Sequence, residues 1–336
     1  MMSWRRAAHL AAVAASILIL AVLVRGLEPA RVLHLLARAK WGWVIAAAII
    51  NLLNTAVEAV RWSFLASSVK PGIRIGAAFR ALIAGALGNV VLPMKLGDGV
   101  RAFVFGESEG LPFASAVSTV VLDRMLDLSV FLAVATVTAL AYPLPQSVLR
   151  ITRYTFMGLG VGLVVLLVML QIERRQRGKG SSAAGSRVMA QFSRFASGLS
   201  VLRRGGLLVP ACALALLSWA TRLMVIWTAS RAFHLALPLA DAAAVLVIIN
   251  VGIAVVATPG NVGPFELAAV GALKLLSVPQ EVALSCAVAL HAAEIVPPVL
   301  LGLALIWSGR LDLGRATKAG ALEPADGRLG GGQSLE

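Results

Sequence analysis

Charged residues are scarce in this sequence: Asp, Glu, Lys and Arg make up 14% of its 336 residues, whereas 59% are hydrophobic. Soluble domains are nearer half apolar and a quarter charged. The mean hydropathy is +0.87. The composition therefore excludes an ordinary soluble domain and predicts an all-α fold, a polytopic bundle of membrane helices.

Residues for metal and nucleophilic chemistry are also few. The chain has four histidines and two cysteines, Cys212 and Cys286, each inside an apolar run. This excludes a disulfide framework and leaves little basis for a metal site. The GxSxG, HExxH, CxxC and Walker patterns are absent from the sequence. We therefore expect no cofactor, no metal and no catalytic residues, and any transport to be downhill or ion-coupled.

Acidic residues number 16 against 30 Lys and Arg, which gives a net charge of +14. The basic residues cluster between apolar runs, as in cytoplasmic loops beside anionic lipid, so nucleic acid is not an expected partner. The longest polar stretch, residues 173–206, is basic and is predicted to be cytoplasmic. It divides one membrane domain, 1–308, into halves 1–172 and 207–308, followed by a disordered tail, 309–336. The protein is expected to be multi-pass in a cell membrane, such as the bacterial inner membrane.

A helix needs about 20 apolar residues to cross a bilayer. About seven to eight spans are predicted, from the runs 7–24, 44–67, 114–141, 156–172, 207–229, 241–257 and 282–307. Two shorter segments, 79–92 and 265–276, are predicted as re-entrant hairpins or short interrupted spans. If 265–276 crosses and 79–92 dips in and returns, the basic segments fall on one side.

Residues 25–43 are predicted to form an interfacial amphipathic helix. Its apolar face consists of Val32, Leu35, Leu36 and Ala39. A tryptophan pair, Trp41 and Trp43, ends the segment and is suited to the head-group region of the membrane.

Two stretches, 88–101 (GNVVLPMKLGDGVR) and 258–266 (TPGNVGPFE), put helix-breaking and polar residues into apolar surroundings. Broken backbone with charge at membrane depth must be buried in protein or line a wet cavity. Two such places, one in each half, suggest one site assembled from both. The residues expected to shape the backbone are Pro93, Gly97, Pro259, Gly260 and Gly263.

The polar side chains of these stretches are candidate lipid-binding residues: Asn89, Lys95, Asp98, Arg101, Asn261 and Glu266. A helix that begins near Gly97 presents free N–H groups and a positive dipole end. With Lys95 and Arg101 nearby, the arrangement favours an anion, and the abundant anion of a membrane is lipid phosphate.

A polar stripe follows the span 44–67. Asn51, Asn54, Glu58 and Arg61 are spaced three, four and three, which puts them on one helical face. The stripe predicts one wall of a hydrophilic groove, or interhelical hydrogen bonding plus a Glu58–Arg61 pair. Both interpretations stay open.

Further charges lie deep in later runs. Asp127 and Asp123 share a face, Arg124 can reach Asp127, and either Lys95 or Arg101 is expected to balance these carboxylates. A structural ion network and direct substrate contact both fit.

His291 and Glu294, three residues apart, are predicted as a pair for packing or for proton coupling. Arg222 is expected to meet an acid such as Glu266.

These stretches resemble the motifs of the lysylphosphatidylglycerol synthase transmembrane family, a flippase-like family also called UPF0104. Its first motif reads approximately N-x-x-(L)-P-x-R-x-G-[DE]-x-x-R, followed by [DE]-R-x-x-D. The matching positions are Asn89, Pro93, Lys95, Gly97, Asp98, Arg101, Asp123, Arg124 and Asp127. The second motif, roughly P-G-x-x-G-x-[FY]-E with a late His, matches Pro259, Gly260, Gly263, Phe265, Glu266 and His291.

The resemblance implies translocation of a lipid between leaflets; fused bacterial members flip an aminoacylated phosphatidylglycerol and carry an aminoacyl-transferase domain. No such domain is seen in this sequence, so synthase activity is not expected. Lys95 stands where the family often has Arg, which removes a bidentate phosphate contact.

The favoured hypothesis is a transporter for a lipid with an anionic head group, such as a phospholipid, a glycolipid or a polyprenyl-linked lipid. Lys95 and Arg101 would bind phosphate, and Asp98, Asp127 and Glu266 would hold the cations or set gating. One alternative is an accessory subunit of a lipid- or polysaccharide-modifying enzyme. Another is a membrane-embedded transferase acting on polyprenyl phosphate.

Overall fold

The computed structural model describes residues 4–25, 27–91, 96–178, 205–256 and 258–311. These residues form helices and no strands, so the prediction of an all-α membrane protein is confirmed. The helices are α1 (Trp4–Val24), α2 (Pro29–Arg38), α3 (Trp41–Ala66), α4 (Ile75–Val91), α5 (Gly97–Glu109), α6 (Phe113–Ala141), α7 (Gln146–Gly178), α9 (Gly205–Ser230), α10 (Leu239–Val255), α11 (Pro264–Leu275) and α12 (Gln280–Trp307), with 3-10 turns η3 (Arg231–Phe233) and η4 (Pro259–Asn261).

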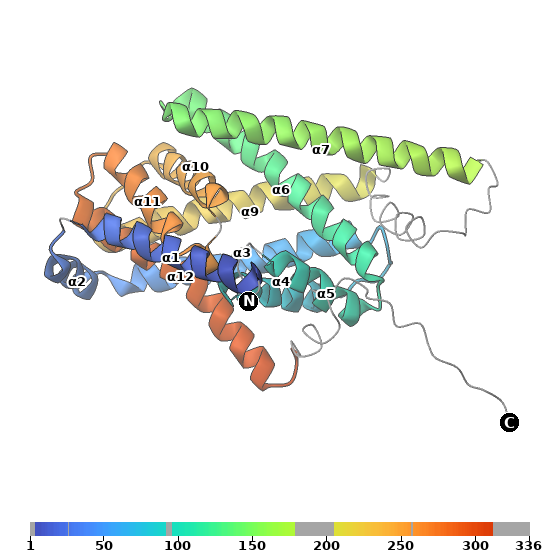
Figure 1. Cartoon of the computed structure of the whole chain (residues 1–336), viewed down its shortest axis with the longest axis horizontal. Coiled ribbons are helices and arrows are strands. Elements are labelled where there is room, and N and C mark those ends of the chain that lie inside the picture. Colours follow the sequence, from blue (N-terminus) through green and yellow to red (C-terminus); the bar gives the residue numbers. More distant parts are fainter. Residues whose placement is uncertain (1–3, 26, 92–95, 179–204, 257, 312–336) are drawn as a thin grey trace.

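Three segments within the described ranges are long and apolar enough to cross a membrane by length and composition: Trp41–Ala66, Gly206–Phe233 and Gln280–Trp307. They correspond to α3, α9 and α12. Figure 1 shows α3 and α9 running along each other through the bundle, with α6 and α7 on one side.

The two halves repeat one pattern of helices. In the first half, α3, α4, α5 and α6 have 26, 17, 13 and 29 residues. In the second half, α9, α10, α11 and α12 have 26, 17, 12 and 28 residues. Each half thus contains a long helix, two short helices and a second long helix, and α1, α2 and α7 lie outside this repeat.

The halves run in opposite directions. The amide of Lys40, just before α3, donates to the carbonyl of Ala232, just after α9. At the other end of the bundle, Leu65 of α3 packs with Ala211 of α9. Because α3 and α9 are antiparallel, the halves form an inverted repeat, an arrangement found in many transporters.

The short helices of each half form a hairpin. Lys70 and Arg74, which follow α3, bind Glu109 at the mouth of the first hairpin, α4–α5. The mouth of the second hairpin, α10–α11, lies by α2, where Arg31 faces Glu281 at 3.9 Å. The hairpins therefore enter from opposite ends of the bundle, as Figure 1 shows.

The helices α4 and α5 pack along each other as a helical hairpin, and the prediction that 79–92 dips into the membrane and returns stays a prediction. The crossing of a membrane by 241–257 stays a prediction, and so do both alternatives for 265–276, a re-entrant hairpin or a short interrupted span. The helix α10 has 17 residues, and α11 packs back along it, so the two form a second helical hairpin.

Close contact between the two helices of each hairpin explains why two positions are occupied by glycine. A Cβ added at Gly97 would overlap the carbonyl oxygen of Gly85, and one added at Gly252 would lie 2.5 Å from the Cβ of Ala268. The tips of the hairpins also meet, because a Cβ at Gly260 would lie 3.9 Å from the Cα of Val90. The two broken stretches are thus brought together, as predicted.

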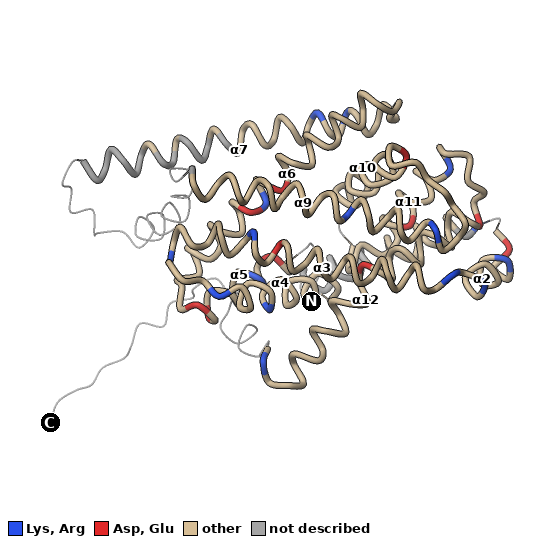
Figure 2. Tube along the Cα trace, turned by 180° about the vertical axis from the view of Figure 1, so that it is seen from behind, with Lys and Arg blue, Asp and Glu red and all other residues tan. Residues whose placement is uncertain are grey.

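The predicted amphipathic segment 25–43 is two elements. The helix α2 ends at Arg38, and Trp41 begins α3, so the Trp pair belongs to the long helix. Val32 and Leu36 pack on the core, as their face predicts. Figure 2 shows the Lys and Arg residues of α2 at one end of the bundle, away from the ion network described below.

Candidate functional site

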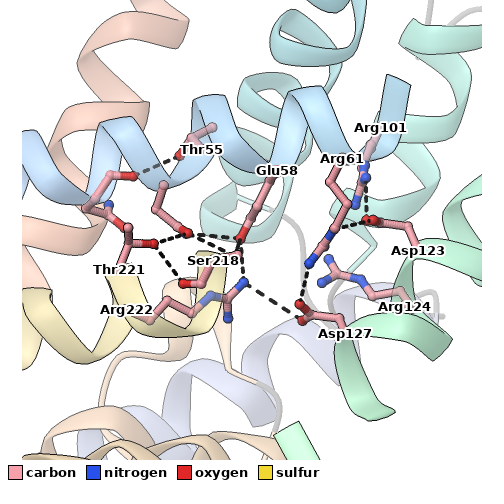
Figure 3. A network of polar contacts seen from close by, with 12 residues as sticks. Thr55, Glu58, Arg61, Arg101, Asp123, Arg124, Asp127, Ser218, Thr221 and Arg222 are labelled. Atoms are coloured by element: carbon pink, nitrogen blue, oxygen red, sulfur yellow. Dashed lines mark hydrogen bonds and ion pairs between the residues drawn. The ribbon is translucent and has the colours of Figure 1, made fainter. Parts of the chain in front are cut away.

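A buried ion network joins α3, α5, α6 and α9 (Figure 3). Nε of Arg61 donates to Asp123 at 2.9 Å and Nη1 donates to Asp127 at 3.0 Å. Nη2 of Arg101 donates to the second oxygen of Asp123 at 2.7 Å. The side chains of Arg61, Arg101 and Asp123 are at most 3% exposed. This network ties the first hairpin to the long helices.

The network continues at both ends. Nη2 of Arg222 donates to Glu58 at 2.5 Å and lies 3.9 Å from Asp127. Arg124 makes a bidentate pair with Asp98, at 2.6 and 3.0 Å. Four arginines thus face four carboxylates. Buried charges are tolerable only when paired, and removing one partner typically costs about 3–5 kcal/mol.

These contacts correct two predicted pairs. Glu58 binds Arg222 and not Arg61, and Arg124 binds Asp98 and not Asp127. In both cases a partner on another helix takes precedence over the neighbour three residues away. Arg101 does balance Asp123, as predicted.

Arg101 is held from two sides, while its buried Nε has no hydrogen-bond partner among the described residues. Besides Asp123, its guanidinium stacks over the ring of Trp62, with Cζ 3.9 Å from the ring centroid. It is 2% exposed, so its surroundings do not fit the phosphate contact expected of it. Pro93 and Lys95 lie outside the described residues.

The N-terminus of α5 begins at Gly97, as predicted, but its free amide is already used. Asn89 accepts the Gly97 N–H at 3.0 Å, and Asp98 stands in the first turn. Both features satisfy the positive end of the helix from within the protein. At this helix end Asn89 thus takes the Gly97 N–H and helps to close the hairpin.

The second hairpin is held at its tip by His291 of α12. Nδ1 of His291 lies 2.5 Å from Oε1 of Glu266, and Nε2 lies 3.0 Å from the carbonyl oxygen of Gly260. The imidazole stacks on Phe265, with ring centroids 4.2 Å apart. Oε2 of Glu266 accepts the Gly263 N–H at 2.7 Å and so caps α11.

The backbone conformation of this tip depends on the residues that were predicted to shape it. Gly260 and Gly263 have φ values of +61° and +95°, where glycine is unstrained. Asn261 also has positive φ, at +57°, which asparagine tolerates better than most residues. Pro259 begins the 3-10 turn. Glu266 and His291 bind each other, so the expected Arg222–Glu266 pair does not form. The proton coupling of His291 with Glu294 stays a prediction.

A cavity of about 250 Å³ lies between the two halves. Its polar lining residues come from α3, α9, α10 and α12, and they are Asn51, Asn54, Thr55, Glu58, Arg222, Asn250 and Glu294. Leu82 and Ala86 of the first hairpin and Phe265 of the second complete the wall with other apolar side chains. The polar stripe of α3 thus does face a cavity, apart from Arg61, which lies in the network.

Hydrogen bonds order this cavity wall. Nδ2 of Asn54 donates to Glu58 at 3.0 Å, while its carbonyl oxygen accepts Ser218 at 2.9 Å and Thr221 at 2.8 Å. Asn51 donates to the backbone oxygen of Glu294 at 2.9 Å.

Two lining groups have spare capacity within the described part of the chain. The buried Nε of Arg222 has no hydrogen-bond partner there. The carboxylate of Glu294 makes no hydrogen bond or ion pair there. Asn250, Ser218 and Thr221 were missed from the sequence; Asn250 offered a signal, as a lone amide in the apolar run 241–257.

A family model described as Lysylphosphatidylglycerol synthase TM region matches residues 9–302. The chain is similar to the "Glycosyltransferase AglD" of Haloferax volcanii, with 27% identity over 124 residues, which cover 37% of this chain and 20% of that protein. It is also similar to the "UPF0104 membrane protein MJ1595" of Methanocaldococcus jannaschii, with 30% identity over 92 residues, 27% of each chain. The matched segments thus span well under half of either relative.

Proposed function

This chain belongs to the family of the lysylphosphatidylglycerol synthase TM region, and from that premise we propose that it moves a lipid with an anionic head group between the leaflets of a membrane. In this proposal the head group enters the cavity between the two halves while the acyl chains stay in lipid. The protein acts as a transporter and not as an enzyme.

The observation that carries the proposal is the cavity itself. A chamber of about 250 Å³ with polar and apolar walls, formed by long helices of both halves and by both hairpins, suits a head group and not a whole lipid. Two hairpins that enter from opposite ends can open it to one side at a time. Inverted repeats of this kind support alternating access around a fixed central site.

Arg222 is the phosphate contact in this proposal, in place of Arg101. Its Nη2 is held by Glu58, while its Nε remains without a partner among the described residues. Asn250 and Asn51 line the same chamber and supply amide groups to the glycerol or sugar part of a head group. A guanidinium oriented by a carboxylate is well placed to hold phosphate.

A vesicle assay tests the proposal. Purified protein is placed in liposomes that contain phosphatidylglycerol with a fluorescent acyl chain, and leaflet exchange is followed by quenching of the outer leaflet. Arg222→Lys keeps the charge opposite Glu58 but removes the Nε–H, and we expect a loss of at least about tenfold, the equivalent of about 1.4 kcal/mol.

The matched control is Arg231→Lys. Arg231 also has a buried Nε without a partner within the described residues, but it stacks on Trp227 away from the cavity. Its variant is expected to keep the wild-type rate. Equal exchange in protein-free and protein-containing liposomes would contradict the proposal.

A second candidate function is favoured by the relative that is named a glycosyltransferase. Here the chain would present a lipid-linked substrate to such an enzyme as an accessory subunit. A glycosyltransferase that copurifies in stoichiometric amount, with sugar transfer indifferent to Arg222→Lys, would favour this candidate over transport.

A further inference from the structure

The inverted halves carry related residues at equivalent positions. Arg124 in α6 and His291 in α12 occupy the same position when each helix is counted from its first residue. Each binds a carboxylate in the first turn of the preceding short helix: Asp98 for Arg124 and Glu266 for His291. Each half thus fastens its hairpin to its second long helix by one acid–base pair.

The chemistry of the two pairs differs. A guanidinium does not release its proton in proteins, so the Arg124–Asp98 pair is permanent. An imidazole, by contrast, can bind and release a proton. The His291–Glu266 pair is therefore the titratable counterpart of a fixed pair.

The carboxylates that follow Arg124 in α6 and His291 in α12 also differ in their cationic partners. By the same count, Asp127 of α6 and Glu294 of α12 are equivalent. Asp127 binds Arg61 at 3.0 Å and faces Arg222. Counting α3 and α9 in this way places Val225 of α9 where α3 has Arg61. Glu294 thus lacks the cation that its counterpart has, and it lines the cavity instead.

Hydrogen bonding fixes the proton count at His291. The carbonyl oxygen of Gly260 is only an acceptor, so Nε2 at 3.0 Å carries a hydrogen. The 2.5 Å separation between Nδ1 and Oε1 of Glu266 requires one more proton between those two atoms. The closed arrangement of the second hairpin therefore holds one exchangeable proton.

We propose that the His291–Glu266 pair and Glu294 form a proton site, in which release of the shared proton frees the second hairpin from α12. This site deepens the proposed function and rests on it, since it couples proton movement to the opening of the head-group cavity. The Arg124–Asp98 pair, which fastens the first hairpin, takes no part in this proton step.

The step is a simple proton transfer. Imidazolium His291, paired with the Glu266 carboxylate, gives its Nδ1 proton to the Glu294 carboxylate, one turn along the same face of α12. The products are neutral His291, which keeps its Nε2 proton on Gly260, and protonated Glu294. The lone pair of Nδ1 then faces the Glu266 carboxylate, and their repulsion loosens the tip.

The charged groups around this site come from several helices. Glu58 of α3 and Arg222 of α9 line the cavity with Glu294, and Arg222 and His291 act on Glu294 electrostatically. From α11 the facing group is Glu266, and the described lining residues from α4 and α10 are uncharged. Arg222 binds Glu58 most closely, which leaves Glu294 free to exchange protons with the cavity.

Hydrogen exchange of the second hairpin tests the release directly and needs no transport. In the full-length protein in liposomes, exchange of the peptide spanning Thr258–Glu266 is measured and corrected for intrinsic rates. We expect its protection to fall at least about tenfold when the pH is raised. His291→Arg, which copies the permanent pair, should abolish this response; Glu266→Gln should lower protection at every pH.

Leaflet exchange and proton flux test the coupling. With fluorescent phosphatidylglycerol and a trapped pH dye, an imposed pH gradient should change the wild-type exchange rate at least about tenfold in sodium-free buffer. Glu294→Gln should respond less than about twofold. The matched control is Glu281→Gln, on the same helix but facing Arg31 outside the cavity, and it should respond like the wild type.

The outcomes separate the two proposals. If lipid moves in the wild type with the same pH response as in Glu294→Gln and His291→Arg, the proton site is overturned and the transport function stands. A requirement for sodium in place of protons also overturns it. If no lipid moves, the proposed function fails, and the hydrogen-exchange result alone decides whether the proton opens the hairpin.

Discussion

Asp123 offers the sharpest test of the ion network. It is 1% exposed and accepts from Arg61 at 2.9 Å and from Arg101 at 2.7 Å, through different oxygens. Asp123→Asn keeps the shape but leaves four arginines facing three carboxylates. Since removing one partner of a buried pair typically costs about 3–5 kcal/mol, we expect a loss of that size in the free energy of unfolding.

The comparison variant is Asp98→Asn, which breaks the bidentate pair with Arg124. The two side chains of that pair are 38% and 44% exposed, and exposed pairs are worth only about 0–1 kcal/mol. Both variants would be unfolded reversibly in mixed micelles by titration with sodium dodecyl sulfate. The two pairs thus differ in burial while sharing the same chemistry.

A double variant adds a second check. Arg101→Met in the Asp123→Asn background restores the charge balance, so the pair of changes should cost less than the sum of the single ones. If Asp123→Asn and Asp98→Asn each cost under about 1 kcal/mol, the reasoning that the network is a buried structural unit is refuted.

Three further predictions concern the first hairpin. Gly97→Ala should prevent its closure and lower the yield of folded protein several-fold, because its Cβ would overlap the carbonyl oxygen of Gly85; Gly99→Ala, with open space around it, is the control, and both are measured by size-exclusion chromatography. Asn89→Ala removes the acceptor of the Gly97 N–H and should cost about 0.5–2 kcal/mol in the same unfolding titration. Glu109→Gln weakens two cationic contacts at the hairpin mouth and should raise proteolysis of the loop after α3, read by mass spectrometry.

The sequence predicted the local features of the site well. Helix-breaking residues at Gly97 and Gly260 marked both hairpin tips, and the three-four-three spacing after Asn51 marked a polar helix face. These signals depend on neighbours in the chain, where helix periodicity determines which side chains share a face. The same periodicity gave the amphipathic face of α2.

The pairing of charges could not be predicted in the same way. Spacing along one helix favoured Arg61 for Glu58, but antiparallel packing of α3 and α9 brings Arg222 against it. Likewise, Glu266 meets His291 only because α11, in the second hairpin, packs against α12. The packing of α11 back along α10 could not be predicted for the same reason, because apolar length alone does not say whether a helix crosses or returns.

The contact between α3 and α9 has a consequence for how such a molecule could evolve. When each helix is counted from its first residue, Asn54 of α3 is equivalent to Ser218 of α9, and the two bind each other. Glu58 and Arg222 are equivalent by the same count, and they also bind each other. Residues at equivalent positions meet because they lie on the local axis that relates the halves.

Two identical copies of the first half, assembled in this way, would set Glu58 against Glu58. Once the halves are joined in one chain, each position on that axis can specialise, one copy keeping the acid and the other acquiring the base. The Glu58–Arg222 pair thus gives this contact the opposite charges that two identical halves could not supply.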